Sequence, residues 1–291
     1  MKELNKELER IDEKIKKNPV YSDILELYKE ILKAKNRYKD ILKVEPLDID
    51  EEMIERAIKN EFPAVRKDKI NADFEALEKY FFELLNLFKE KEEDLAEELK
   101  SAIQRREINL KELVRDVLVR GVDTKGENGD AEEESWSDNK TVRLLIYEAL
   151  RPVMESYSQT LKDKIKDEDW GKGVCPVCGE KPRMAELRGE EGKRIFMCSL
   201  CSHEWSFMRV KCPFCENDNQ EELGYLSVEG EPNYRINICK KCKGYIKTIN
   251  TKDFGEDADV SLVLEDITTL HLDILAKKEG FKKENIALFY P

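Results

Sequence analysis

The cysteines of this sequence are spaced for binding metal ions. All eight occur between residues 175 and 242, in four Cys-x-x-Cys pairs. Four thiolates bind a zinc or iron ion tetrahedrally, and two Cys-x-x-Cys turns that face each other supply them. The sequence therefore predicts two ions, each in a four-cysteine site, with no cysteine left over. The predicted ligands are Cys175, Cys178, Cys198, Cys201, Cys212, Cys215, Cys239 and Cys242.

The spacing leaves the pairing of these turns open. In a sequential arrangement the first two pairs hold one ion and the last two hold the other, whereas an interleaved arrangement alternates them. Gly179 follows the first pair and suits the left-handed backbone at the end of such a turn. Glu216 occupies the equivalent place after the third pair and predicts a less ideal turn. Iron and zinc both accept four thiolates, so the ligands do not choose between them.

Three uses of such sites compete. The ions could be structural staples of a protein-binding module, which is the usual role of closed four-cysteine sites. A pair such as Cys198 and Cys201 could instead be a redox-active dithiol, a hypothesis that four pairs together disfavour. The third use is nucleic-acid binding. Residues 171–250 contain 13 basic and 11 acidic residues, and two divalent ions with eight thiolates would bring this charge to about −2, a poor match for phosphates.

Residues suited to catalysis are sparse. The two histidines, His203 and His271, are far apart in sequence, and we expect one at a strand end and one on a helix face. Neither a glycine-rich phosphate loop nor a nucleophile elbow is present. We therefore predict no catalytic residues and no enzymatic activity.

The elements that must position the cysteines follow a helical first half. Residues 1–166 show apolar side chains at three- and four-residue spacing, as in Phe74, Leu77, Phe81 and Leu84, and predict an α-helical domain. The segment 122–139 interrupts this pattern with an acidic, glycine-containing stretch that we expect to be a solvated loop.

The cysteine-containing region, 167–250, changes to short strands and turns. Residues 194–197 lead into the second cysteine pair, and 225–228 with 234–238 predict a hairpin around Gly230. Each half is predicted to form a small module, here called a ribbon, in which a hairpin connects two Cys-x-x-Cys turns, here called knuckles. Each ribbon is too small to fold without its ion. Helical periodicity returns in 251–291, where Val263 to Ile274 predict one helix that ends before Gly280. The predicted fold class is α+β.

Composition suggests where the protein works. The net charge of −12 disfavours charge-driven binding to nucleic acid or to a membrane surface. The beginning of the sequence shows no secretory signal, and no apolar run reaches the ~18–20 residues of a membrane span. Paired cysteines in such a chain favour metal thiolates in a reducing compartment. We expect a cytoplasmic protein that is not inserted in a membrane.

The cysteine region and its flanks resemble the formate dehydrogenase accessory protein FdhE family. The resemblance extends over about half of the chain. Its motifs are Leu150-Arg151-Pro152, Trp170-Gly171, the stretch from Cys175 to Pro182, Arg194 to Trp205, Arg209 to Cys215, Cys239 to Lys247 and, near the end, Glu265 to Leu270 with Leu272-Asp273, Gly280-Phe281 and Asn285. The helical half resembles the family only in its helicity and length.

The resemblance implies a maturation factor that is not an enzyme and has rubredoxin-like metal sites, for which iron is the usual metal of the family. Such proteins bind the catalytic subunit of respiratory formate dehydrogenase in the cytoplasm, before assembly or export is complete. Carried over to this sequence, the eight cysteines are the ligands. Two alternatives remain: a redox protein that passes an electron to that client, and a nucleic-acid-binding regulator.

Five other residues match recurring motif positions of the family, and the resemblance marks them as candidates for contact with the partner. Packing within the ribbons is the competing explanation, above all for Trp205 and Tyr245. The sequence departs from the family pattern at Glu216, where glycine is usual, and in the acidic loop at 122–139. The five candidates are Arg194, Trp205, Arg209, Tyr245 and Lys247.

Overall fold

The computed structural model describes most of the chain as two compact units. Unit 1 comprises Met1–Leu47 and Arg66–Ser156, and unit 2 comprises Asp48–Val65 and Tyr157–Pro291. Residues 122–134 of the predicted acidic loop lie outside the described part of the chain. No helix among the described residues is long and apolar enough to cross a membrane. The described residues are 2–42, 44, 50–67, 70, 72–89, 93–120, 135–166, 170–255, 259–285 and 289.

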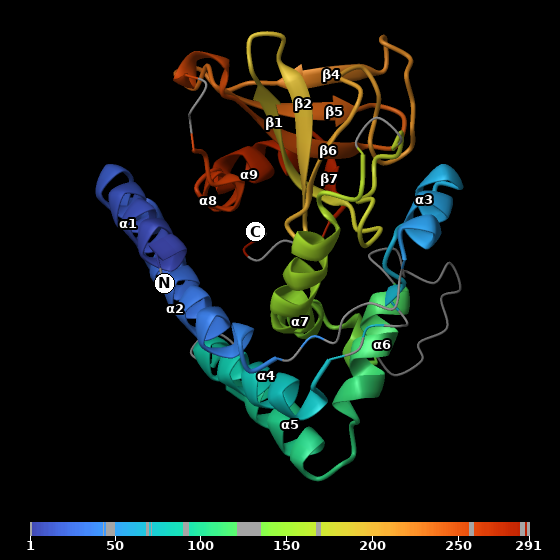
Figure 1. The fold of residues 1–291 in the computed structure, drawn as a ribbon. Coiled ribbons are helices and arrows are strands. Elements are labelled where there is room, and N and C mark those ends of the chain that lie inside the picture. Colours follow the sequence, from blue (N-terminus) through green and yellow to red (C-terminus); the bar gives the residue numbers. More distant parts are fainter. Residues whose placement is uncertain are drawn as a thin grey trace. The chain divides into compact units, whose positions relative to one another are not determined.

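Unit 1 is helical, which confirms the predicted character of the N-terminal half (Figure 1). The apolar spacing noted above becomes a buried face, since Leu77, Phe81 and Leu84 are completely buried. Neighbouring helices pack in pairs, α1 with α2, α2 with α4 and α4 with α5. The helices are α1 (Lys2–Lys17), α2 (Ser22–Lys39), α4 (Phe74–Phe88), α5 (Glu93–Gln104), α6 (Leu110–Arg120) and α7 (Lys140–Leu161), the last of which enters unit 2 at Tyr157.

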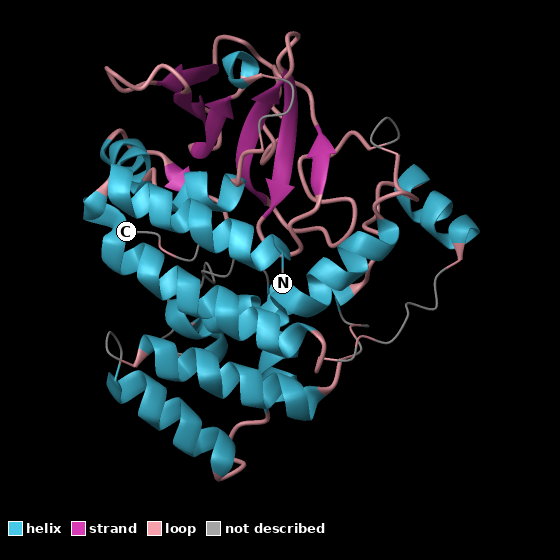
Figure 2. Cartoon of the chain, turned by 60° about the vertical axis from the view of Figure 1, so that its left-hand side comes forward, coloured by secondary structure: helices cyan, strands magenta, loops and turns pink. Residues whose placement is uncertain are grey.

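Unit 2 contains a mixed sheet, drawn in magenta in Figure 2. The strand order is β3-β2-β1-β6-β5-β4, and β7 pairs with β6. Neighbours are antiparallel except for β1 with β6 and β6 with β7, which are parallel. The strands are β1 (Pro182–Arg188), β2 (Lys193–Cys198), β3 (Glu204–Ser206), β4 (Leu223–Leu226), β5 (Tyr234–Cys239), β6 (Gly244–Asn250) and β7 (Lys282–Lys283).

Both predicted hairpins are present. The turn between β1 and β2 has glycines with positive φ at Gly189 and Gly192, a conformation that residues with a Cβ rarely adopt. In the second hairpin Leu226 of β4 pairs with Ile236 of β5. Ile236 and Ile238 share the face that packs against the helix residues Leu272 and Ala276, while Tyr234 packs at the edge of this cluster.

The two ribbons form one sheet. Each half runs through a knuckle, two antiparallel strands, a second knuckle and a third strand. The first strand of the first half, β1, pairs in parallel with the third strand of the second half, β6. Thr251 reinforces this pairing, because its hydroxyl donates to the Glu186 carboxylate at 2.6 Å. The shared sheet means that neither metal site stands on an isolated ribbon.

The predicted C-terminal helix is two helices, α8 (Leu262–Ile267) and α9 (Leu270–Lys278). At the break, the hydroxyls of Thr268 and Thr269 donate to carbonyls four residues earlier, at 2.8 and 2.6 Å. Such bonds compete with the backbone and bend helices. Helix α9 ends at Lys278, before Gly280 as predicted, and Gly280 makes a left-handed turn after which the Phe281 N–H donates to the Ala276 carbonyl.

Segment 48–65, with α3 (Glu51–Lys59), belongs to unit 2 although it precedes most of unit 1 in sequence. It contacts the first cysteine pair through its backbone. The N–H groups of Ala64 and Val65 donate to the carbonyls of Pro176 and Val177 at 2.9 and 2.8 Å. The division into domains 1–166, 167–250 and 251–291 stays a prediction.

Candidate metal centres

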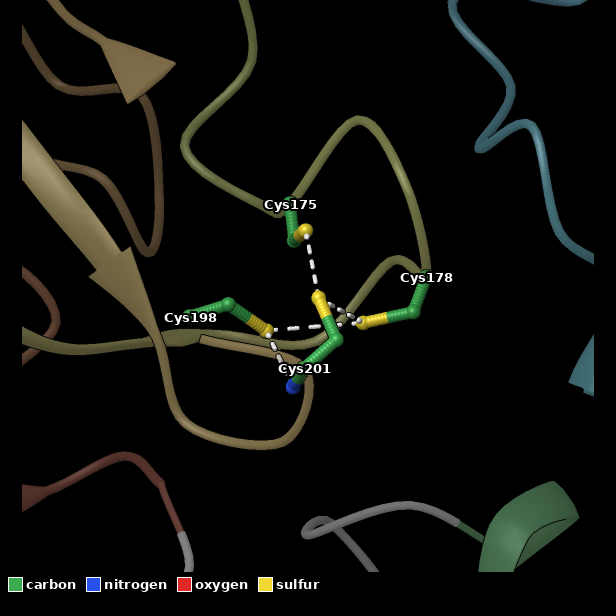
Figure 3. Close-up of side chains that lie close together, drawn as sticks. All are labelled: Cys175, Cys178, Cys198 and Cys201. Carbon is green, nitrogen blue, oxygen red and sulfur yellow. Dashed lines mark hydrogen bonds between the residues drawn. The ribbon is translucent and has the colours of Figure 1, made fainter. Parts of the chain in front are cut away.

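The first cluster brings together the sulfurs of the first two cysteine pairs (Figure 3). Cys175 and Cys178 come from the loop before β1, while Cys198 ends β2 and Cys201 lies in the turn that follows. The Sγ atoms of Cys178 and Cys198 are 3.4 Å apart, and those of Cys175 and Cys201 are 3.5 Å apart. All four side chains are buried.

The second cluster brings together the last two pairs in the same way. The Sγ atoms of Cys212 and Cys242 are 3.7 Å apart, as are those of Cys215 and Cys239. Cys215 and Cys242 are partly exposed, unlike any cysteine of the first cluster. The grouping is therefore sequential, and the interleaved arrangement is not the one that the structure contains.

The spacing of the sulfurs fits a tetrahedral ion. Metal–sulfur bonds of about 2.3 Å give a tetrahedron whose edges are about 3.8 Å. Within each cluster the four sulfurs lie within 4.8 Å of one another, and a disulfide would need about 2.05 Å. Both clusters could hold a metal ion, and four thiolates suit iron as well as zinc.

The four knuckles share one backbone feature. The residue after the second cysteine has a positive φ in all four: Gly179, Ser202, Glu216 and Lys243, at 75°, 56°, 57° and 61°. The amide of this residue returns to the first cysteine's carbonyl in three knuckles, as from Gly179 to Cys175 at 2.8 Å. Glu216 thus adopts the turn that glycine would favour, and its carboxylate pairs with Lys172 and Lys211 at 3.2 and 3.0 Å.

Several N–H groups donate hydrogen bonds to the cysteine sulfurs, which favours their thiolate form. In the first cluster the N–H groups of Leu200 and Cys201 both donate to Cys198 Sγ at 3.4 Å. In the second, Gly244 N–H donates to Cys242 Sγ at 3.4 Å and the Asn217 side-chain amide lies 3.7 Å from Cys239 Sγ. Such donors stabilise thiolates and orient them around an ion. Asn217 is a supporting residue that the cysteine spacing gave no means of finding.

Burial also changes the pKa values of the cysteine thiols. Burial raises the pKa of Cys175 and of Cys201 well above the ordinary value. In the second cluster burial likewise raises the pKa of Cys242 to about 11, whereas donors from Cys242, Asn217 and Lys241 outweigh burial and lower that of Cys239 to about 7. Buried thiols with raised pKa values ionise only when a cation compensates their charge, which is what a bound metal supplies.

Four of the five residues predicted to contact another protein are buried, and each of them makes hydrogen bonds or ion pairs within unit 2. Trp205 is fully buried, and its indole N–H donates to the Lys172 carbonyl at 3.3 Å. The Tyr245 hydroxyl donates to Asp273 Oδ1 at 2.6 Å. Both side chains therefore pack within unit 2, and contact of either residue with another protein stays a prediction.

The remaining three candidates differ in exposure. Lys247 is buried, and its Nζ reaches Asp273 Oδ2 at 2.6 Å. Arg194 is buried, and its Nη1 donates to two backbone carbonyls, at 3.1 and 3.0 Å. Arg209 is exposed, with one contact from Nη1 to the Glu191 carbonyl at 3.2 Å. As folded, Arg209 is the one member of this set whose side chain faces solvent.

Neither histidine belongs to a cysteine cluster. His203 is buried, with Nδ1 at 3.4 Å from the Ser158 hydroxyl. His271 Nε2 lies 2.9 Å from Glu231 Oε2. Their positions match the strand-end and helix-face placements that the sequence suggested.

The sequence did not reveal a buried ion cluster beneath β6. Lys247 Nζ lies 2.8 Å from Asp266 Oδ1, and Lys283 Nζ lies 3.2 Å from Asp266 and 3.1 Å from Asp273. Burial alone would raise the pKa of Asp266, but the two lysines lower it below its ordinary value. Residues 36 positions apart in sequence meet here, so periodicity alone could not have paired them.

Two protein-family models match this chain, one in each half of the cysteine-containing region. The model described as "FdhE, central domain" matches residues 174–209, and "FdhE, C-terminal domain" matches residues 210–290. Each matched range contains one four-cysteine cluster. The pairing of β1 with β6 therefore joins the two family domains in one sheet.

Relatives extend this likeness to nearly the whole chain. An FdhE homologue of Aquifex aeolicus is 30% identical over 280 residues, which cover 95% of this chain and 91% of the relative. A homologue of Edwardsiella ictaluri is 38% identical over 120 residues, 40% of this chain and 37% of that protein. The crystal structure of the FdhE protein from Pseudomonas aeruginosa matches with a TM-score of 0.60 over 98% of this chain and 94% of that one, and at 21% identity it supports the fold. On the Aquifex match and the two family models, this chain belongs to the FdhE family.

Proposed function

We propose that this protein is a metal-binding accessory factor, not an enzyme, that binds the catalytic subunit of respiratory formate dehydrogenase in the cytoplasm during assembly, before export. Membership of the FdhE family is the observation that carries the proposal. The fold adds two four-cysteine clusters, the first fully buried and the second partly exposed.

The eight cysteines would hold two ions, iron or zinc. A bound ion would cross-link the two knuckles of each ribbon and offset the charge of the thiolates. Because each ribbon is small, binding of the ion is coupled to its folding. The role assigned to the metals is therefore to keep unit 2 in the shape that recognises the client.

Client contact would need an exposed surface, and Arg209 is the candidate that supplies one. Near it in sequence, Met208 and Val210 are 59% and 52% exposed. Apolar side chains next to an arginine are a composition typical of protein interfaces. The surface around residues 208–210 is thus our proposed contact region for the subunit.

An anaerobic pull-down of the tagged full chain from its native cytoplasm tests this function. Mass spectrometry should find a formate dehydrogenase catalytic subunit enriched with the unaltered protein and lost with Cys198→Ser/Cys201→Ser, together with one ion per chain. Lys193→Met, an exposed strand lysine outside both clusters, should retain the subunit. Absence of any dehydrogenase subunit, or its retention by metal-free variants, would refute the proposal.

A redox role is the second candidate, and the partial exposure of Cys215 and Cys242 favours the second cluster for it. An iron ion near the surface exchanges electrons more readily than a fully enclosed one. This role requires an iron–thiolate absorption band that bleaches reversibly on reduction and is lost in Cys239→Ser/Cys242→Ser. A protein that contains only zinc would eliminate it.

A further inference from the structure

A cavity of about 210 Å³ lies in unit 2 beside the second cysteine cluster. Segment 209–214 forms one side, and residues of β4 and β5 form the other. Basic side chains share this cavity with apolar ones. The residues that matter below are Arg194, Arg209, Lys211, Tyr225 and Ile238.

The buried arginine of this cavity is incompletely satisfied. Arg194 is 4% exposed, and its Nη1 donates to the carbonyls of Met208 and Lys211. Its Nε is buried without a hydrogen-bond partner in the described part of the chain. A buried donor without a partner destabilises the folded protein, and a charged donor does so more strongly. A ligand that accepts from Nε would recover this cost.

Three arginines gather here, and none of them forms an ion pair with a carboxylate in the described part of the chain. Burial lowers the pKa of Arg194 to about 10, and the neighbouring charges of Arg235 and Arg209 act in the same direction. Arg235 lies outside the lining, but burial and Arg209 lower its pKa as well, and its buried Nε also has no hydrogen-bond partner among the described residues. Lys211, by contrast, already pairs with Glu216 at 3.0 Å.

Compensation of the metal cluster explains only part of this charge. Four thiolates around a divalent ion carry a net charge of about −2. Arg194, Arg209 and Arg235 carry three positive charges, so positive charge remains after the cluster is neutralised. Low-dielectric walls concentrate the field of this excess inside the cavity.

The mouth of the cavity is apolar. Tyr225 and Val210, both in the lining, are 63% and 52% exposed. The Arg235 guanidinium lies 5.8 Å from the centre of the Tyr225 ring. An organic group would cover these side chains while its charged end reached the arginines.

We propose that this cavity binds an organic oxyanion, a phosphate ester or a carboxylate with an apolar body. Arg194 Nε and Arg209 would donate to the oxyanion, since planar guanidinium groups match both phosphate and carboxylate geometry. Tyr225 and Ile238 would contact the apolar body. The cavity shares Arg209 and Val210 with the client-contact region proposed above, but the inference rests on the cavity and not on that function.

Calorimetric titration of the metal-loaded full chain with phenyl phosphate, benzoate, inorganic phosphate and benzyl alcohol tests the site. At low salt, phenyl phosphate or benzoate should bind one per chain and at least about tenfold more tightly than inorganic phosphate, and benzyl alcohol should not bind. The tighter of the two organic anions identifies the head group. Saturation by neither of them at millimolar concentration would overturn the proposal.

Variants locate the binding. Arg209→Gln should weaken it about 10- to 100-fold, the value of a charge-assisted hydrogen bond. Arg235→Gln, which removes a nearby charge outside the lining, should weaken it less. Arg188→Gln, a strand arginine that pairs with Glu186 and Glu204 outside the cavity, should change it less than twofold. Since Arg194→Gln alters a buried group, the exposed Arg209 is the decisive position. Equal affinity of Arg209→Gln, Arg235→Gln and the unaltered protein would also overturn the proposal.

Discussion

At the scale of single residues, Gly173 lies against the backbone of the third cysteine pair. A Cβ added at Gly173 would stand 1.9 Å from the Pro213 carbonyl oxygen, whereas one added at Gly171 would meet no atom within 4 Å. The obstacle is backbone, so no side-chain rotation relieves it. The close approach fixes the start of the ribbon region relative to the turn that carries Cys212 and Cys215.

Gly173→Ala should lower the free energy of unfolding of unit 2 by about 1–3 kcal/mol or more and weaken retention of the second ion. Gly171→Ala, two residues away, should change stability by about 0.5 kcal/mol or less. Denaturant unfolding and metal content of the two variants measure the difference. Indistinguishable variants would show that the chain relaxes around Pro213.

Glu216 tests the cost of a left-handed knuckle. Its φ of 57° costs a residue with a Cβ about 1 kcal/mol, while its ion pairs with Lys172 and Lys211 are partly exposed and weak. Glu216→Gly should therefore have a free energy of unfolding about 1 kcal/mol higher than Glu216→Gln, measured by denaturant unfolding. Both variants lose the charge, and only the glycine relieves the backbone, so equal stabilities would mean that the turn is unstrained.

At the scale of elements, the break between α8 and α9 provides backbone carbonyls that bind a buried lysine of strand β6. The carbonyls of Asp266 and Thr269, near the break, accept from Lys247 Nζ at 2.6 and 3.4 Å. The same Nζ pairs with the carboxylates of Asp266 and Asp273. A central strand thus holds both helices through one buried cation, and apolar packing of Leu272 and Ala276 completes the contact.

Lys247→Met should destabilise unit 2 by about 3–5 kcal/mol, because two buried carboxylates then lose one of the two lysines that pair with them and keep Lys283. Hydrogen exchange should rise in α8 and α9 before it rises elsewhere in unit 2. The exposed strand lysine of Lys193→Met controls for loss of charge alone and should leave exchange unchanged. Wild-type protection of α8 and α9 in Lys247→Met would contradict the role assigned to this cation.

Local signals in the sequence account for what could be predicted of these elements. The cysteine spacing identified the eight ligands but left their grouping into two clusters open, and alternating apolar residues with glycine turns identified both hairpins. The parallel pairing of β1 with β6 joins residues more than 60 positions apart, and no local pattern encodes it. The helix break at Thr268 was hidden because apolar spacing continues through it, and side-chain hydrogen bonds overrode that periodicity. Burial of Arg194 and Lys247 likewise depends on the joined sheet.

At the scale of the whole molecule, the two units have different sources of stability. Unit 1 has a core of helix residues, with Leu25, Leu77 and Leu145 fully buried. Unit 2 has smaller apolar clusters beside its sheet, and both cysteine clusters lie in it. Burial of apolar area stabilises the first unit regardless of metal, whereas we expect folding of the second to be coupled to the ions proposed for its cysteine clusters.

Removal of the ions should therefore unfold the ribbons and leave the helical core. After treatment with a chelator under reducing conditions, hydrogen exchange should rise throughout β1 to β6, while α4 and α5 keep their protection. Protection of the strands should return when zinc or ferrous iron is added back in the absence of oxygen. The Cys198→Ser/Cys201→Ser variant should spread the loss from the first ribbon into the second through the pairing of β1 with β6. Loss confined to residues 175–206 would instead mean that each ribbon folds on its own ion and that the shared sheet adds little.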